Sequence, residues 1–92
     1  MTQGKPGNEP ELPKLDFTTF ILSLRASASV HLGDAPGPDG TLDRDLELAQ
    51  GDIAILSVLH EKTKGNLTGE EERLLDEVLD EARERYEEIA RG

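Results

Sequence analysis

The segment from Lys62 to Glu71 constrains the fold more than any other part of the chain, and it reads KTKGNLTGEE. Its two lysines complement the negative end of a helix dipole, and Gly65 can adopt the left-handed conformation that ends a helix. Thr68 suits the N-cap of a following helix, and Glu71 completes a capping box with it. The segment therefore predicts a tight turn between two neighbouring antiparallel helices. Its exposed residues are also our candidates for contact with a partner protein: Lys62, Lys64 and Asn66.

The chain has 92 residues, which is enough for one small domain. Residues 1–14 contain three prolines and few apolar side chains, so we expect a disordered tail before a single helical domain at 15–91. A domain of this size buries barely enough apolar surface to offset its chain entropy. Because the chain has no cysteine, neither disulfides nor thiolate zinc sites can stabilise it further. We therefore expect a second copy of the chain to add to the buried surface.

Hydrophobic periodicity predicts an all-α fold of three helices. Their expected ranges are about 17–32, 46–64 and 69–90. Asp16 suits the N-cap of the first helix, and Gly33 suits its end. The segment 34–41 contains two prolines and two glycines and therefore predicts a loop. Gly51 is unusual in the middle of the second helix, because glycine there costs about 1 kcal/mol relative to alanine.

The first predicted helix is apolar on more than one side. Beyond its main stripe it carries Leu22, Ala26 and Val30, and Arg25 is its one fully charged residue. Such a helix is normally buried on more than one side. In a monomer of three helices at least one flank would face water, so we predict that this helix takes part in dimerisation. The residues predicted to form the core and the self-association surface are Phe17, Phe20, Ile21, Leu24 and Ala28.

The formal net charge of −10 is distributed unevenly. Residues 66–92 hold ten acids and four bases, which leaves this part of the chain at −6. An acidic chain repels phosphate, so we expect binding neither to nucleic acid nor to anionic membranes. The chain also has no apolar run near the 20 residues of a membrane span, and a cytoplasmic location is expected. One alternative is that the acidic third helix binds a basic partner by mimicking nucleic acid.

No cluster of residues indicates catalysis, so we expect neither an enzyme nor a cofactor. His31 and His60 are the only histidines, and neither forms an i,i+4 pair with another ligand. We expect His31 to contact the last carbonyls of its helix or to pack at an interface. The many carboxylates of the third helix fall on its predicted solvent face. The alternative is a metal- or ligand-binding bundle that uses His31, His60 and nearby carboxylates.

The chain resembles the bacterial domain-of-unknown-function 1844 family over residues 16–88. The similarity rests on Val30-His31-Leu32-Gly33, on the run Lys62-Thr63-Lys64-Gly65-Asn66-Leu67-Thr68, and on Phe20, Leu22, Ser23, Leu24, Leu48, Ala49, Ile53, Leu56, Leu59, Glu71, Glu72, Leu74, Leu75, Leu79, Arg83 and Tyr86. The resemblance implies a short helical protein of no assigned activity. The chain departs from the family pattern at Gly51, Asp52 and Ala54, where the family has polar residues and an acid after the isoleucine. If that acid had a chemical task, Ala54 could not perform it.

These observations together predict a non-catalytic homodimer. We expect it to act as an adaptor or regulator through contacts with another protein, because no convergent polar site accompanies the apolar first helix.

Overall fold

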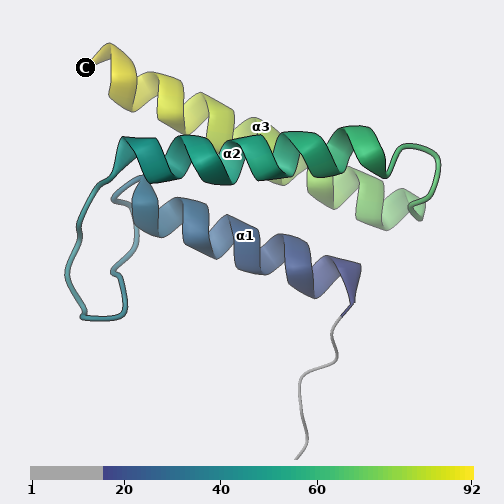
Figure 1. Cartoon of the computed structure of the whole chain (residues 1–92), viewed down its shortest axis with the longest axis horizontal. Coiled ribbons are helices and arrows are strands. Elements are labelled where there is room, and N and C mark those ends of the chain that lie inside the picture. The colour runs from purple at the N-terminus through teal and green to yellow at the C-terminus, as the bar shows by residue number, and fades with distance from the viewer. Residues whose placement is uncertain (1–15) are drawn as a thin grey trace, which may run out of the picture.

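The computed structural model describes residues 16–92, and these form three α-helices (Figure 1). The helices are α1 (Phe17–His31), α2 (Leu46–Lys62) and α3 (Gly69–Arg91). No strand occurs between residues 16 and 92, so the predicted all-α class is confirmed. The predicted tail at residues 1–14 lies outside the described residues. None of the helices in the described part is long and apolar enough to cross a membrane.

Helix α1 begins and ends at the predicted signals. The backbone N–H of Thr19 donates to the Asp16 side chain at 2.8 Å, which caps the first turn. The helix stops before Gly33, whose φ is +84°. A side chain at Gly33 would be strained by this φ and would also meet Arg44, since an added Cβ would lie 3.0 Å from Nε. The Arg44 side chain is held beside Gly33 because its Nε donates a hydrogen bond to the Leu32 carbonyl at 2.9 Å.

The turn between α2 and α3 has the expected caps. Thr68 and Glu71 form the reciprocal capping box, with N–H···O distances of 2.9 and 3.1 Å. Gly65 has a φ of +81°, as a helix-ending glycine requires. Helix α2 ends at Lys62 rather than at residue 64, because Thr63 serves as its C-cap and bonds the Leu59 carbonyl. The chain then reverses, and α3 returns behind α2 (Figure 1).

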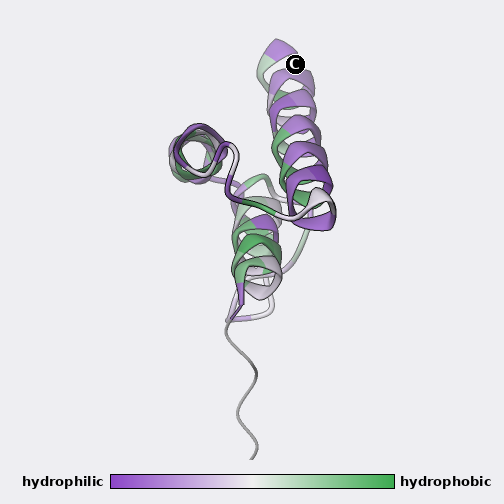
Figure 2. Ribbon diagram, turned by 90° about the vertical axis from the view of Figure 1, so that its right-hand side faces the viewer, coloured by the Kyte–Doolittle hydropathy of each residue, from purple (hydrophilic) through white to green (hydrophobic). Residues whose placement is uncertain are grey.

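Each helix packs against the two others, so the core lies between all three. Its buried members come from every helix: Ile21, Leu56, Leu75, Val78, Leu79 and Ala82. Phe17, Leu24, Ile53, Leu59, Leu67 and Leu74 pack around them and are half-buried. Figure 2 shows that α3 is built mostly of hydrophilic residues, whereas α1 is largely hydrophobic. The charged side of α3 faces solvent, and α1 and α2, which carry fewer charges, form another side of the molecule.

Candidate functional site

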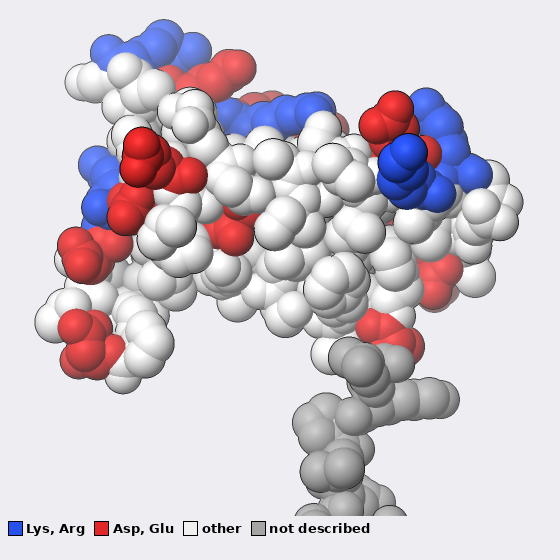
Figure 3. Space-filling view, in the orientation of Figure 1, with Lys and Arg blue, Asp and Glu red and all other residues white. Residues whose placement is uncertain are grey.

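The side of the molecule formed by α1 and α2 carries few charged groups. In Figure 3 most of this side is white; one acidic patch shows within it, and most other charged residues lie around it. The sequence explains this, because residues 48–59 of α2 contain a single charged residue, Asp52, and α1 contains only Arg25. We call this side the uncharged face. Its residues follow from helical spacing and exposure: Phe20, Ser23, Ser27 and Val30 on α1, and Leu48, Gly51, Ile55 and Val58 on α2.

Large apolar side chains are exposed on the uncharged face. Phe20 is 40% exposed, Leu48 52%, Ile55 46% and Val58 52%. A shallow hollow lined by Ala54, Ile55, Val58 and Leu59 lies on the same helix and has almost no polar lining. Single exposed apolar residues are ordinary on a soluble protein, but a contiguous group of them marks an interaction surface. Ile55 and Val58 lie together at this hollow, which makes the uncharged face a candidate interaction surface.

The only buried charged residue in the described part of the chain, Asp52, lies beneath the uncharged face. Its side chain accepts a hydrogen bond from Ser27 Oγ at 3.2 Å, and His31 Nδ1 lies 2.5 Å from its other oxygen. Both contacts cross from α1 to α2. The trio resembles a catalytic triad in composition only, because Ser27 bonds the carboxylate and not the imidazole. Among the described residues no imidazole contacts the hydroxyl, and Ser27 and His31 instead satisfy a buried carboxylate.

The two histidines belong to separate contacts. His60 Nε2 lies 2.8 Å from Asp76 on α3, whereas His31 contacts Asp52. His60 and Asp52 are eight residues apart on α2, which separates the two contacts by about 12 Å along the helix. Among residues 16–92 no group of three potential ligands is close enough to hold a metal ion. The expected contact of His31 with the last carbonyls of α1 does not form, because its ring turns toward Asp52 on α2.

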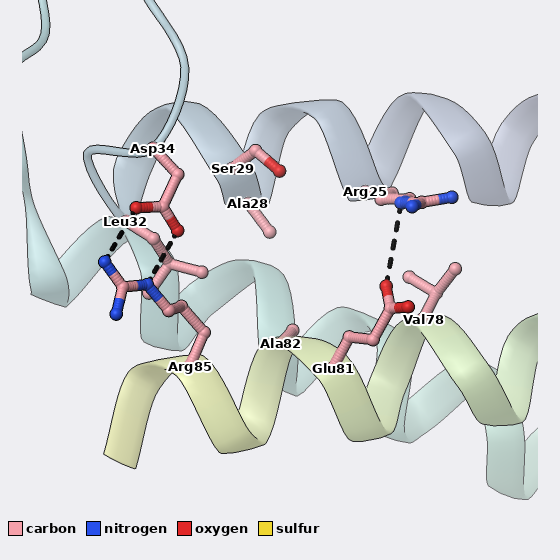
Figure 4. A pocket seen from close by; sticks show the side chains of 9 residues that line it. All are labelled: Arg25, Ala28, Ser29, Leu32, Asp34, Val78, Glu81, Ala82 and Arg85. Atoms are coloured by element: carbon pink, nitrogen blue, oxygen red, sulfur yellow. Dashed lines mark hydrogen bonds and ion pairs between the residues drawn. The ribbon is translucent and has the colours of Figure 1, made fainter. Parts of the chain in front are cut away.

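A groove between α1 and α3 is closed at both ends by ion pairs (Figure 4). Arg25 Nε lies 3.7 Å from Glu81, and Arg85 forms two hydrogen bonds of 2.9 Å to Asp34. The hydrogen bonds from Arg85 hold the pKa of the Asp34 carboxyl below its ordinary value. Asp34 in turn raises the pKa of the Arg85 guanidinium. Because both pairs join complementary groups of this chain, the groove presents no unpaired charge to a ligand.

The structure divides the residues that we predicted for self-association. Ile21 and Ala28 lie fully in the core of one copy, so they cannot meet a second chain while the bundle is folded. Phe17 and Leu24 are half-buried against the core, and Phe20 alone of the five is exposed on the uncharged face. Ile21 and Ala28 therefore belong to the core part of that prediction, and self-association through the other three residues stays a prediction. The two core residues are buried because α2 and α3 already cover the main apolar stripe of α1.

Sequence reasoning missed the contribution of α2 to the uncharged face. None of the residues that we predicted for self-association lies on α2, and Leu48 served only for the family resemblance. The available signal was the run at 48–59, which is too poor in charge for a helix with one solvent side. The candidates for partner contact, Lys62, Lys64 and Asn66, are all exposed at the turn, at one end of α2.

The chain belongs to the family described as domain of unknown function (DUF1844), whose family model matches residues 14–88. No curated protein and no solved structure is similar to it.

Proposed function

We propose that this chain is a non-catalytic homodimer that acts as an adaptor or regulator through protein–protein contacts in the cytoplasm. The observation that supports it best is the uncharged face of α1 and α2, with four large apolar side chains exposed on it. Burying such side chains is favourable by roughly 25 cal/mol for each Å² removed from water. This additional burial matters for the stability of a small three-helix domain, because such a domain buries a smaller fraction of its surface than a large one.

The charge distribution favours a second copy as the occupant of the uncharged face. With a net charge of −10, two chains repel one another over most approaches. Approach through the uncharged face places both copies of α3 on the outside, where their acidic surfaces are farthest apart. An acidic partner of another kind would meet the same repulsion, and a basic partner would find its complement on α3 instead.

The turn that joins α2 to α3 is the proposed contact for the partner protein. Lys62, Lys64 and Asn66 are exposed there, and no ion pair involves either lysine within the described residues. The two lysines form a small basic site at the end of an otherwise acidic molecule. They would suit an acidic segment of the partner.

The dimer is tested by light scattering on the unmodified chain over a dilution series. The proposal is supported if the measured mass is that of two chains and falls to the mass of one chain only at low concentration. It is refuted if the chain is a monomer at all concentrations above micromolar.

The adaptor role is tested by capture from the native cell with the unmodified chain and with a Lys62→Glu/Lys64→Glu variant. A protein held by the first and released by the second supports contact at the turn. Matched variants Arg73→Glu and Arg91→Glu on α3 control for the change in net charge. If all variants capture the same proteins, the turn is not the binding site. Capture that depends on α3 and disappears as the salt concentration rises would favour the alternative of a basic partner on the acidic helix.

A further inference from the structure

Among residues 16–92, neither the backbone nor the packing requires a glycine at position 51. It lies in the middle of α2, where glycine weakens a helix relative to alanine. Its backbone is helical, so no left-handed conformation requires a glycine. A Cβ added at Gly51 would meet no atom within 4 Å, so no neighbouring part of the chain requires the space. The glycine is exposed, and it lies on the uncharged face between Leu48 and Ile55.

The exposed residues of α2 follow the spacing of a helix that pairs with another helix. Leu48, Gly51, Ile55 and Val58 are separated by three, four and three residues, which is the a and d pattern of a coiled coil. Three of the four are large and exposed, and the glycine leaves a gap in the stripe. A paired helix packs well when a large side chain enters such a gap.

We propose that α2 pairs in antiparallel orientation with α2 of a second copy, and that Ile55 of each chain fills the space at Gly51 of the other. Leu48 of each chain then packs against Val58 of the other. Position 53 is midway between positions 51 and 55 and also midway between positions 48 and 58. A single two-fold axis that passes beside residue 53 therefore generates both copies of both contacts, as an isologous dimer requires. This arrangement rests on the proposed homodimer and specifies its contact.

The charges and helix dipoles favour the antiparallel orientation over the parallel one. The N-terminal end of α2 is net acidic, with Asp43, Asp45 and Glu47 against Arg44, and its C-terminal end is net basic, with Lys62 and Lys64 against Glu61. Parallel helices would bring like charges and like dipole ends together, whereas antiparallel helices bring opposite ends together. A parallel pair would also place Gly51 opposite Gly51 and leave a void at the centre of the contact.

The absence of cysteine from the chain allows a direct test by cross-linking. Leu48→Cys and Val58→Cys change exposed residues, so neither variant disturbs the core. The two variants are mixed, allowed to exchange chains, and treated with a thiol cross-linker shorter than about 10 Å. In the proposed pair, position 48 of one chain lies opposite position 58 of the other. The two copies of position 48 are then ten residues apart along the paired helices, about 15 Å, and so are the two copies of position 58. The cross-linker is too short to join them.

Cross-linked dimer in the mixture, with none in either variant alone, is the expected result. Cross-linking of Leu48→Cys with itself would show a parallel pair and overturn the inference. A dimer by light scattering with no cross-link in the mixture would show that another face is used, which overturns the inference and leaves the proposed dimer standing. If the unmodified chain is a monomer by light scattering, both the antiparallel contact and the proposed homodimer are refuted.

Gly51→Leu provides a second measurement that does not depend on cross-linking. The added side chain occupies the space for Ile55 of the other chain, so the dissociation constant of the dimer should rise by about tenfold or more. The same substitution should raise the helicity of the diluted monomer, because leucine favours helix over glycine. A variant with unchanged or tighter association would contradict the proposed packing.

Discussion

His31 on α1 contacts Asp52 on α2 through its Nδ1 atom, 2.5 Å from the carboxylate. Together with the hydrogen bond from Ser27, this contact ties the C-terminal half of α1 to α2 around Asp52, a residue that is only 8% exposed. A buried carboxylate is stable only while its partners are in place. The pairing of α1 with α2 therefore depends on polar as well as apolar contacts.

Removal of Asp52 should destabilise the fold. Asp52→Ala leaves the partly buried Ser27 hydroxyl and His31 ring without their acceptor, so the free energy of unfolding should fall by about 1–3 kcal/mol. Asp76→Ala is the matched control, because it removes a comparable contact with His60 at an exposed site. That change should cost about 0–1 kcal/mol. Urea unfolding at one fixed protein concentration gives both values, and equal losses would show that Asp52 has no special role.

The sequence predicted those features of the fold that depend on local interactions. The caps at Asp16 and Thr68 and the left-handed glycines at 33 and 65 each involve residues within a few positions of one another. The all-α class follows from hydrophobic periodicity for the same reason. Contacts between distant residues were not predicted, because they depend on how the helices are rotated and aligned.

The pairs His31–Asp52 and Asp34–Arg85 illustrate this limit, since they join residues 21 and 51 positions apart. The sequence drew attention to His31 and Asp52 separately, but it gave no sign that they contact each other, and Asp34 and Arg85 looked like ordinary surface residues. The uncharged face was missed for a related reason. Whether Ile55 and Val58 belong to the core or to the surface depends on which sides of α2 are covered by α1 and α3.

The core position of Ile21 predicts a large loss of stability on truncation. Ile21→Ala should lower the free energy of unfolding by about 2–5 kcal/mol, since a fully buried side chain leaves a cavity. Its neighbour Phe20 is 40% exposed, so Phe20→Ala should cost clearly less despite the larger side chain. Thermal and urea unfolding of the two variants check the order. The reverse order would mean that Phe20, and not Ile21, faces the core.

The capping box should contribute measurably to the stability of α3. Thr68→Ala removes the oxygen that accepts the Glu71 N–H at 3.1 Å, and the expected loss is about 1 kcal/mol. Glu77→Ala, at an exposed position within α3, controls for a general effect of substitution and should change stability by less than about 0.5 kcal/mol. Denaturant midpoints of the two variants provide the comparison. If Thr68→Ala is no less stable than the control, the cap does not support the helix.

The ion pair between Asp34 and Arg85 predicts a pH-dependent contribution to stability. Hydrogen bonds from Arg85 lower the pKa of Asp34 below 3.8 in the folded chain. The pair therefore stabilises the fold above pH 3.8, and the contribution is lost as the pH falls through the lowered pKa. It should be small, because both side chains are more than one-third exposed to solvent.

Asp34→Asn should consequently be slightly less stable than the unmodified chain at neutral pH. The difference in unfolding temperature should shrink toward zero as the pH falls below the pKa of Asp34. Thermal unfolding followed by circular dichroism from about pH 7 to about pH 2 tests this. A difference that stays constant over the whole range would show that the substitution acts through something other than the ion pair.

The uncharged face predicts which exposed apolar residues matter for association. Ile55 lies on this face, whereas Leu22 is similarly exposed, at 43%, but lies on nearly the opposite side of α1 from Phe20. A glutamate at either position adds the same charge to the surface of the monomer. Only at position 55 should the charge be buried between two copies, where an unpaired carboxylate is strongly unfavourable.

The most direct test is the mass in solution of Ile55→Glu and Leu22→Glu, measured by light scattering beside the unmodified chain. We expect the unmodified chain and Leu22→Glu to have twice the chain mass of 10.1 kDa, and Ile55→Glu to have the mass of one chain. Circular dichroism confirms that each variant keeps its helices. A single-chain mass for all three proteins, or a dimer that survives Ile55→Glu, would contradict association through the uncharged face.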